Sequence, residues 1–299
     1  MKFPVHKLCE KYNFFVEGVS YIGEPREGTA MFITNKVAHL LDNLAGMKHC
    51  LIFAELGIEP TKEMEQENCF IFSDCPSRQY AAWAQSLLQE ERKDESQKKY
   101  TLTEDGYFLG QGVQLGKNVV IEPGCIIGHG VTIGDNSYIM AGAVIKHSSI
   151  GENVVVNEYA VIGAQGFTMT RDEQGNLQRM PTLGQVCIED DVEIGAHDNV
   201  SRGSGGDTVI ERGAKIDALV HIGHDAHIGA NSEITAGGII GGFVRAKTDT
   251  YTGINAVVRN RIELGEHCVV GMGATVTKSV APNTTVIGNP ARVYEKKKA

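Results

Sequence analysis

Aliphatic or small residues recur at every sixth position through the second half of the chain. Between residues 216 and 276 this register consists of Ile216, Ile222, Ile228, Ile234, Ile240, Ala246, Thr252, Val258, Leu264, Val270 and Val276. A second register, four residues later, holds mostly small or β-branched residues: Val220, Ala226, Ser232, Gly238, Val244, Thr250, Ala256, Ile262, Cys268, Ala274 and Val280. This period is typical of a solenoid in which each hexad is a short strand and a turn, with about 18 residues in each triangular coil.

The same spacing occurs earlier in the chain. It includes Leu109, Leu115, Ile121, Ile127, Ile133, Ile139 and Ile145, slips by one residue to Ile150, Val156 and Ile162, and resumes at Ile188, Ile194 and Val200. A single short strand cannot bury its apolar face, whereas stacked coils bury a continuous aliphatic column. Roughly half the chain or more is therefore predicted to be one parallel β-helix, stabilised by roughly 25 cal/mol for each Å² of buried apolar surface.

Residues 1–100 contain no hexads and instead alternate short apolar strands with helical patterns. The expected strands are Ala30–Ile33, Cys50–Ala54 and Cys69–Phe72, and the expected helices are Lys36–Ala45 and Ser77–Glu90. This alternation predicts a small α/β domain. Asp74 and Pro76 are expected to open the second helix in cap and first-turn positions, and the charged stretch Glu90–Lys99 to end it and link it to the solenoid. The β-helix domain is then expected over residues 101–299.

The hexads stop between Ile162 and Ile188. They are replaced by Gly163-Ala164-Gln165-Gly166-Phe167 and a polar segment that ends near Pro181. An insertion of this length usually projects from one face of a solenoid and helps to build a site. The sequence therefore predicts a projecting loop at residues 163–187.

The composition narrows the classes of partner. The net charge is −9, and no block of basic residues is longer than the terminal Lys296-Lys297-Lys298. This balance argues against nucleic acid and anionic membranes, which leaves a small-molecule substrate. There is no C-x-x-C pair among the seven cysteines, which points to a reducing compartment. With no signal-peptide pattern and no apolar stretch of about 20 residues, a cytoplasmic location and no membrane span are expected.

Three histidines occur at intervals of three residues: His221, His224 and His227. Since residues 222 and 228 point inward, His224 is expected on a turn, where it can reach a groove or a neighbouring chain. One interpretation is a set of surface histidines. The other is zinc bound between subunits, as in the related β-helix carbonic anhydrases, which would make the chain a zinc-dependent hydratase. Residues three apart lie on different stretches of a coil, which disfavours zinc binding within one chain.

The segment around His224 carries a more specific signal. The run Ile216–Asp225, followed by Ile228-Gly229 and Ala236-Gly237-Gly238, resembles the catalytic coil of the UDP-3-O-acylglucosamine N-acyltransferase family of lipid A synthesis. Upstream, Gly163–Phe167 is similar to that family's G-x-D-G-F motif. Arg202-Gly203 with Asp207-Thr208 is similar to its R-G…D-T motif, and the resemblance is collinear from about residue 15 to residue 292. It implies a mainly β fold, a left-handed parallel β-helix of hexapeptide repeats preceded by a small α/β uridine-binding domain.

The resemblance also implies catalytic roles. His224 would be the general base, because an amino sugar attacks a thioester only after losing a proton, which an imidazole can accept near neutral pH. The backbone N–H of Gly242, one coil beyond, would stabilise the oxyanion, although a turn glycine with positive φ is the alternative. Asp217 and Asp225 flank the histidine and could orient its ring or contact the sugar, or simply be solvated turn carboxylates.

Substrate-binding residues follow from the same resemblance. Phe32 and Asn35 match the residues that hold uracil by stacking and hydrogen bonding, although Phe32 could equally be a buried strand residue. Gln165 and Phe167 belong to the loop motif, with Gln165 in place of the family's aspartate.

Several positions depart from the family's pattern. Arg261 stands where the family has a second histidine; it could hold a phosphate or donate to an oxyanion but cannot act as a base. Ala38 stands where the family has an aromatic tyrosine in its uracil site. The family's C-terminal helices, which are associated with acyl-carrier-protein docking, are not expected between the closing turn and Ala299. The differences affect substrate recognition more than the chemistry at the expected base.

The favoured function is N-acylation of a UDP-linked amino sugar by an acyl-phosphopantetheine thioester, carried by acyl carrier protein or CoA, in a homotrimer. The thioester is a co-substrate, and no tightly bound cofactor or metal is expected. The main alternative is an acyl- or acetyl-CoA-dependent acetyltransferase that acts on a nucleotide-linked amino sugar in surface-polysaccharide synthesis. A non-catalytic β-helix scaffold is a further alternative.

Overall fold

A computed structural model describes residues 2–172 and 174–294 and divides the chain into two units. The N-terminal unit comprises Met1–Ser96, Phe167–Gly184 and Ser204–Gly206, and the β-helix unit comprises Gln97–Gly166, Gln185–Gly203 and Asp207–Ala299. The terminal lysine block lies outside the described residues. No helix in the described part of the chain is long and apolar enough to cross a bilayer.

The N-terminal unit contains a parallel sheet in the order β3-β4-β5-β6. Its strands are β3 (Gly18–Val19), β4 (Thr29–Ile33), β5 (Leu51–Glu55) and β6 (Cys69–Ser73), and its helical elements are η1 (Val5–Lys7), η2 (Asn35–Leu44), α1 (Lys62–Glu67) and α2 (Pro76–Gln97). Two antiparallel pairs complete it: β1 (Phe3–Pro4) with β2 (Phe15–Val16), and β18 (Met169–Arg171) with β19 (Leu177–Arg179). The second pair is the hairpin of the insertion.

Three details of the N-terminal unit differ from the sequence-based expectation. The first expected helix is a 3₁₀ helix interrupted by non-helical backbone at Val37. The second helix extends to Gln97, so most of the expected linker is helical, because glutamate, lysine and arginine are good helix formers on exposed faces. Pro76 does open that helix, but Cys75 rather than Asp74 directly precedes it, and the Cys75 carbonyl accepts the N–H groups of Arg78 and Gln79.

The core of the N-terminal unit forms where α2 covers one face of the sheet. The rings of Tyr80 and Trp83 lie 5.9 and 5.7 Å from that of Phe53. Met180 and Leu183, which follow the hairpin of the insertion, pack in the same core. The segment from Phe167 to Gly184 is therefore part of the N-terminal unit and is held there by apolar packing.

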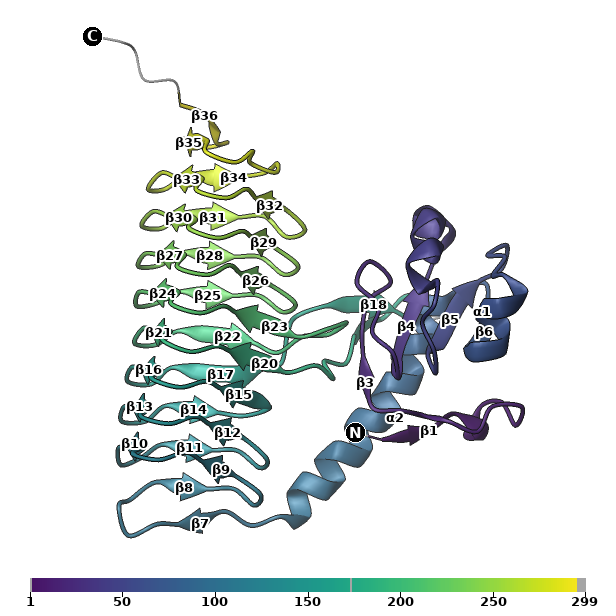
Figure 1. The fold of residues 1–299 in the computed structure, drawn as a ribbon, viewed down its shortest axis with the longest axis horizontal. Coiled ribbons are helices and arrows are strands. Elements are labelled where there is room, and N and C mark those ends of the chain that lie inside the picture. The colour runs from purple at the N-terminus through teal and green to yellow at the C-terminus, as the bar shows by residue number, and fades with distance from the viewer. Residues whose placement is uncertain (1, 173, 295–299) are drawn as a thin grey trace. The chain divides into compact units, whose positions relative to one another are not determined.

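The β-helix unit consists of three parallel sheets, named here faces 1, 2 and 3 in the order in which one coil visits them (Figure 1). Face 1 comprises β10 (Val120–Ile121), β13 (Tyr138–Ile139), β16 (Val155–Val156), β21 (Glu193–Ile194), β24 (Lys215–Ile216), β27 (Glu233–Ile234), β30 (Tyr251–Thr252), β33 (Val269–Val270), β35 (Thr285–Ile287) and the antiparallel β36 (Arg292–Val293).

Face 2 begins with the antiparallel pair β7 (Thr101–Leu102) and β8 (Phe108–Leu109). It continues with β11 (Ile126–Ile127), β14 (Val144–Ile145), β17 (Val161–Ala164), β22 (Asn199–Ser201), β25 (His221–Ile222), β28 (Ile239–Ile240), β31 (Val257–Val258) and β34 (Thr275–Val276). Face 3 comprises β9 (Gln114–Leu115), β12 (Thr132–Ile133), β15 (Ser148–Ile150), β20 (Val186–Ile188), β23 (Thr208–Ile210), β26 (His227–Ile228), β29 (Arg245–Ala246) and β32 (Glu263–Leu264).

The hexad prediction is confirmed by burial. Every residue of both registers between Ile216 and Val280 is buried, and strands of successive coils pair 18 residues apart, as Ile222 does with Ile240. Leu109 and Leu115 are only partly covered, because they lie in the first coils of the stack. The aliphatic column is thus continuous from Ile121 onward.

The corners of the coils require a left-handed backbone, and the residues there suit it. On the corner between faces 3 and 1, Asn118, Asn136 and Asn153 have φ between 55 and 59°. Asparagine tolerates this region better than most residues. The Asn118 side chain also donates to that of Asn136 at 3.0 Å, so the corner is joined by side-chain as well as backbone bonds.

One carboxylate, Asp198, occupies the buried second register. Its oxygens accept the N–H groups of Gly195 and Val220, each at 2.8 Å, and the residue is 1% exposed. Burial, assisted by the charge of Asp217, outweighs these two bonds and raises the pKa of Asp198 to about 7. The carboxylate therefore holds two turns together and titrates near neutrality.

We expect Asp198 to make stability depend on pH. Its native pKa lies above the ~3.9 of an unfolded chain, so the native state binds more protons between about pH 4 and pH 7. The contribution of this extra bound proton to the free energy of unfolding is present in full below that window. It is lost, at up to ~1.4 kcal/mol per pH unit, as the pH rises through it. Urea unfolding should show that wild type loses stability relative to Asp198→Asn between pH 5 and pH 8. The exposed Asp105→Asn is the control, and a pH-independent difference for Asp198→Asn would contradict the assignment.

Candidate active site

The corner between faces 2 and 3 carries His224, in the turn between β25 and β26. Its side chain is 14% exposed, and Nδ1 lies 2.6 Å from Oδ2 of Asp225, whose own side chain is 2% exposed. A buried carboxylate that contacts one ring nitrogen fixes the orientation of the imidazole.

Two residues from other coils hold the backbone of Asp225. The hydroxyl of Thr208 accepts the Asp225 N–H at 2.8 Å, and the guanidinium of Arg245 donates to the Asp225 carbonyl at 3.0 Å. Thr208 is fully buried and donates its own proton to the carbonyl of Ser201 at 2.7 Å. Neither residue has a role predicted from the sequence, in which the Asp207-Thr208 motif is the only signal.

Gly242 lies directly against the imidazole. A Cβ atom on Gly242 would stand 2.8 Å from Nε2 and 2.9 Å from Cε1 of His224, so an added side chain would require the imidazole to shift. Its φ is not positive, whereas that of the next residue, Phe243, is 59°. The same position of other hexads is occupied by Ala218, Ala236 and Asn260. The alternative of a glycine required by a positive φ is therefore wrong, and the close contact with His224 is what favours glycine here.

The N–H of Gly242 is open beside this imidazole. In other turns a carboxylate 19 residues earlier accepts the corresponding N–H: Glu122 for Ala141 at 2.9 Å, Glu211 for Ala230 at 2.8 Å and Asp217 for Ala236 at 3.1 Å. The residue 19 before Gly242 is Gly223, which has no side chain, and within the described residues no group accepts the Gly242 N–H. A backbone donor next to Nε2 is thus available for a ligand.

An aromatic ring and a cation continue the same corner in the next two coils. Phe243 meets His224 edge to face, with centroids 5.3 Å apart, and the Arg261 guanidinium lies 4.2 Å from the centroid of Phe243. Asp225, Phe243 and Arg261 are spaced by 18 residues and share the left-handed corner conformation. Arg261 is exposed and reaches the histidine only through the phenyl ring, so it supplies positive charge at the rim of the site.

The loop motif contributes a second glycine contact. A Cβ on Gly166 would lie 2.7 Å from Cβ and 2.9 Å from Cγ of His224, so the chain passes close over the histidine here. Gln165 is exposed. Phe167 belongs to the N-terminal unit and is 74% exposed, with the Arg179 guanidinium 5.0 Å from its ring centroid.

The other candidates on the β-helix belong to other strands and turns. Asp217 is an exposed turn carboxylate that accepts the N–H groups of Ala218 and Ala236 on the corner between faces 1 and 2. His221 points outward from face 2. His227 on face 3 bonds through Nε2 to Glu211 at 2.7 Å, and although burial raises the pKa of Glu211, this bond and the N–H of Ala230 lower it overall.

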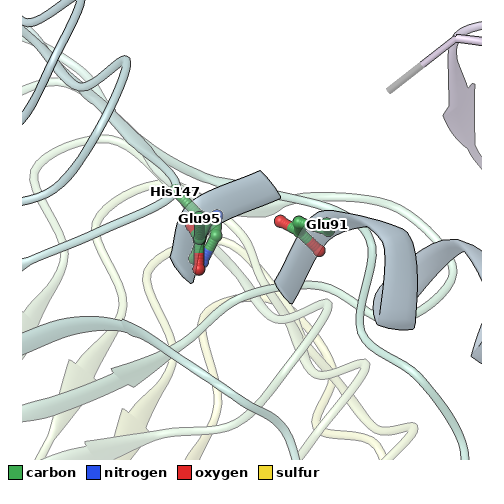
Figure 2. Close-up of side chains that lie close together, drawn as sticks. All are labelled: Glu91, Glu95 and His147. Carbon is green, nitrogen blue, oxygen red and sulfur yellow. The ribbon is translucent and has the colours of Figure 1, made fainter. Parts of the chain in front are cut away.

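These positions bear on the zinc interpretation. Figure 2 shows Glu91 and Glu95 one turn apart on α2; they belong to the N-terminal unit, whereas His147 belongs to the β-helix. Within either unit, no three His, Cys, Asp or Glu side chains of residues 2–172 and 174–294 converge on one point. His221, His224 and His227 therefore form no ligand set within one chain.

The expected nucleotide-binding residues lie where parallel strands end, the usual ligand edge of such a sheet. Phe32, near the end of β4, is half-buried with its ring 5.3 Å from that of Tyr80, so it is partly used in packing. Asn35 is exposed; its amide donates to the carbonyl of Leu56 at 3.0 Å, and its amide oxygen accepts no hydrogen bond within the described residues. Ala38 is exposed nearby in η2.

Family models match the repeat region. The model for the bacterial transferase hexapeptide (six repeats) matches residues 106–139 and 130–164, and that for the hexapeptide repeat of succinyl-transferase matches residues 250–278. These matches agree with the coils seen in the structure.

Curated relatives share a name that describes acyl transfer. UDP-3-O-acylglucosamine N-acyltransferase of Herminiimonas arsenicoxydans is 39% identical over 133 residues, which cover 44% of this chain and 37% of the relative. The protein of that name from Coxiella burnetii (strain Dugway 5J108-111) is 36% identical over 132 residues, or 44% of this chain and 38% of the relative. The chain thus spans less than half the length of the curated relatives that it matches.

Solved structures resemble the β-helix. Francisella novicida UDP-N-acetylglucosamine acyltransferase has a TM-score of 0.58 at 25% identity, over 64% of this chain and 68% of that one. The enzyme of that name from Campylobacter jejuni has a TM-score of 0.57 at 24% identity, over 65% and 74%. These likenesses confirm the expected left-handed parallel β-helix of hexapeptide repeats.

We expect Gly242→Ala to displace the imidazole of His224 while the protein stays folded. The added Cβ would otherwise stand 2.8 Å from Nε2, and alanine already occupies the same turn position at residues 218 and 236. Crystal structures of the two proteins and their melting temperatures would test this. Asn260→Ala, at the same turn position one coil further on, is the control. An imidazole that keeps its wild-type position in the glycine variant would contradict the expectation.

Proposed function

We propose that this chain is an N-acyltransferase that moves an acyl group from a phosphopantetheine thioester to the amino group of a UDP-linked amino sugar, as in lipid A synthesis. The observation that carries the proposal is the pairing of His224 and buried Asp225 with the open N–H of Gly242 beside Nε2. The names of the curated relatives support it.

The geometry suits each step of acyl transfer. The neutral amine attacks the thioester carbon, and Nε2 of His224 takes a proton from the nitrogen as the C–N bond forms. Asp225 stabilises the resulting imidazolium. The carbonyl oxygen gains negative charge and can accept a hydrogen bond from the Gly242 N–H. Collapse of the tetrahedral intermediate breaks the C–S bond, and the departing thiolate takes the proton from the imidazolium.

The N-terminal unit is proposed to hold the nucleotide of the acceptor. The open amide oxygen of Asn35 can accept the N–H of a uracil, and the exposed part of Phe32 offers an apolar surface for its ring. The packing of Phe32 on Tyr80 and the small Ala38 favour a second candidate, another nucleotide-linked amino sugar with acyl- or acetyl-CoA as donor.

We also propose a homotrimer in which face 2 packs against a neighbouring copy. Most outward residues of face 2 are apolar, and Asn199, His221 and Thr275 are the polar exceptions. The apolar ones are Phe108, Ile126, Val144, Val161, Ile239 and Val257. The outward residues of face 3 are mostly polar: Gln114, Thr132, Ser149, His227, Arg245 and Glu263. An apolar row of this extent is typical of a subunit interface. His224 would then lie at the edge of a groove between subunits, where a phosphopantetheine arm could enter.

The partners follow from this proposal: acyl carrier protein or acyl-CoA as donor, and a nucleotide sugar as acceptor. We propose a cytoplasmic location, because a reducing compartment keeps cysteines such as the seven of this chain as thiols.

We expect His224→Ala to lower kcat by ~10²- to 10⁴-fold, the usual contribution of a general base. The assay would follow acylation of UDP-3-O-acylglucosamine by mass spectrometry, with hydroxyacyl-acyl carrier protein and acyl-CoA as alternative donors. His267→Ala, an exposed histidine on another corner, should retain full activity.

Two outcomes would change the proposal. Retention of most activity by His224→Ala would rule out His224 as the base. A wild-type protein that ignores UDP-3-O-acylglucosamine but acylates another nucleotide-linked amino sugar from acyl-CoA would select the second candidate.

We expect light scattering to give wild type three times the mass of one chain. Ile239→Lys should reduce that mass, because it places a charge in the apolar row of face 2, where Ile239 is 43% exposed in the single chain. Glu233→Lys, an exposed outward position on face 1, should not. A monomeric wild type, or an unchanged mass for Ile239→Lys, would contradict the proposed interface.

A further inference from the structure

Corner residues with positive φ normally donate their N–H to a carbonyl of the preceding coil. Phe243 donates to the carbonyl of His224 and Arg261 to that of Gly242, each at 3.0 Å. The acceptor is the residue 19 positions earlier, as it also is for Gly130, which donates to Gln111 on the same corner. This repeated bond fixes each corner on the one before it.

Asp225 is an exception to this rule. The residue 19 positions earlier is Gly206, in an irregular segment that interrupts the coil and belongs to the N-terminal unit. The Asp225 N–H is instead accepted by the side-chain oxygen of Thr208 at 2.8 Å. The side-chain hydroxyl of Thr208 thus replaces the backbone carbonyl that would accept this N–H in a regular coil. It does so at Asp225, the residue that contacts His224.

We propose that Thr208 is a positioning residue for acyl transfer, whose hydroxyl fixes the Asp225 turn and through it the orientation of the His224 imidazole. The inference rests on the proposed function, in which His224 is the base. The hydroxyl is well suited to this task, because it is fully buried and its own proton is committed to the carbonyl of Ser201 at 2.7 Å. Its oxygen is therefore held with a lone pair toward the Asp225 N–H.

Removal of this hydroxyl has a definite structural consequence. The Asp225 N–H and the Ser201 carbonyl would both lose a partner in a buried region, so the turn would rearrange to satisfy them. The buried carboxylate of Asp225 would move with its backbone, and the 2.6 Å contact with Nδ1 would lengthen. Misplacement of a catalytic group by about 1 Å can cost ~10²-fold in rate.

The test compares Thr208→Val, which keeps the shape but loses the hydroxyl, with Thr208→Ser, which keeps the hydroxyl. Thr208→Ala is measured alongside them, in case the valine variant does not assemble. Thr250→Val is the matched control: it also removes a buried hydroxyl bonded to a backbone carbonyl, that of Lys247 at 2.7 Å, but it does not touch Asp225.

We expect kcat to fall by ~10- to 100-fold in Thr208→Val and Thr208→Ala, with KM for both substrates changed by less than about threefold. Thr208→Ser and Thr250→Val should stay within about threefold of wild type. A fall in kcat with little change in KM, restored by Thr208→Ser, is the result that a purely structural hydroxyl would not give.

Crystal structures of the variants separate the possible failures. If Thr208→Val and Thr208→Ala keep the contact of Nδ1 with Asp225 and the wild-type rate, the positioning role is wrong while the enzyme proposal stands. If wild type acylates no amino sugar, the proposed function fails. The lengthened contact in the valine variant then still decides whether Thr208 fixes this turn.

Discussion

The 18-residue register between coils is the constraint on which the rest of this structure depends. Each inward aliphatic lies on the one before it and after it, and the backbone ladder locks this alignment, with strands about 4.8 Å apart. Residues 18 apart are therefore neighbours in space. Gly242 comes to lie on His224, and Phe243 on Asp225, as a result of this stacking.

The candidate active site lies where regular stacking meets an interruption. The segment around residues 202–207 removes the carbonyl that would hold the Asp225 N–H, and Thr208 supplies an oxygen in its place. The chain also leaves the β-helix unit after Gly166, which lies beside His224. A solenoid without interruptions has corners that are all alike, and these two departures distinguish the corner of His224 chemically from its neighbours.

Much of the fold could be predicted from the sequence, because a six-residue period has few structural solutions. Both registers are buried as expected from Ile121 onward. The three predicted strands of the N-terminal sheet agree to within about a residue, whereas β3 was not predicted. The expected linker Glu90–Lys99 is mostly helix, because charged residues suit an exposed helix as well as a solvated linker. The capping role of Asp74 was wrong for a local reason: Cys75 stands between it and the first helical residue.

The sequence alone determined the β-helix, the place of His224 on a corner and the stacking of Gly242 one coil beyond it, since these follow from counting a short period. Only the tertiary structure decided which carboxylate serves the histidine: Asp225 contacts Nδ1, whereas Asp217 caps a different corner. It also decided why residue 242 is glycine and what holds Asp225. The physical reason is that hydrogen bonds and steric contacts depend on side-chain direction across coils, to within fractions of an ångström, which periodicity in the sequence does not specify.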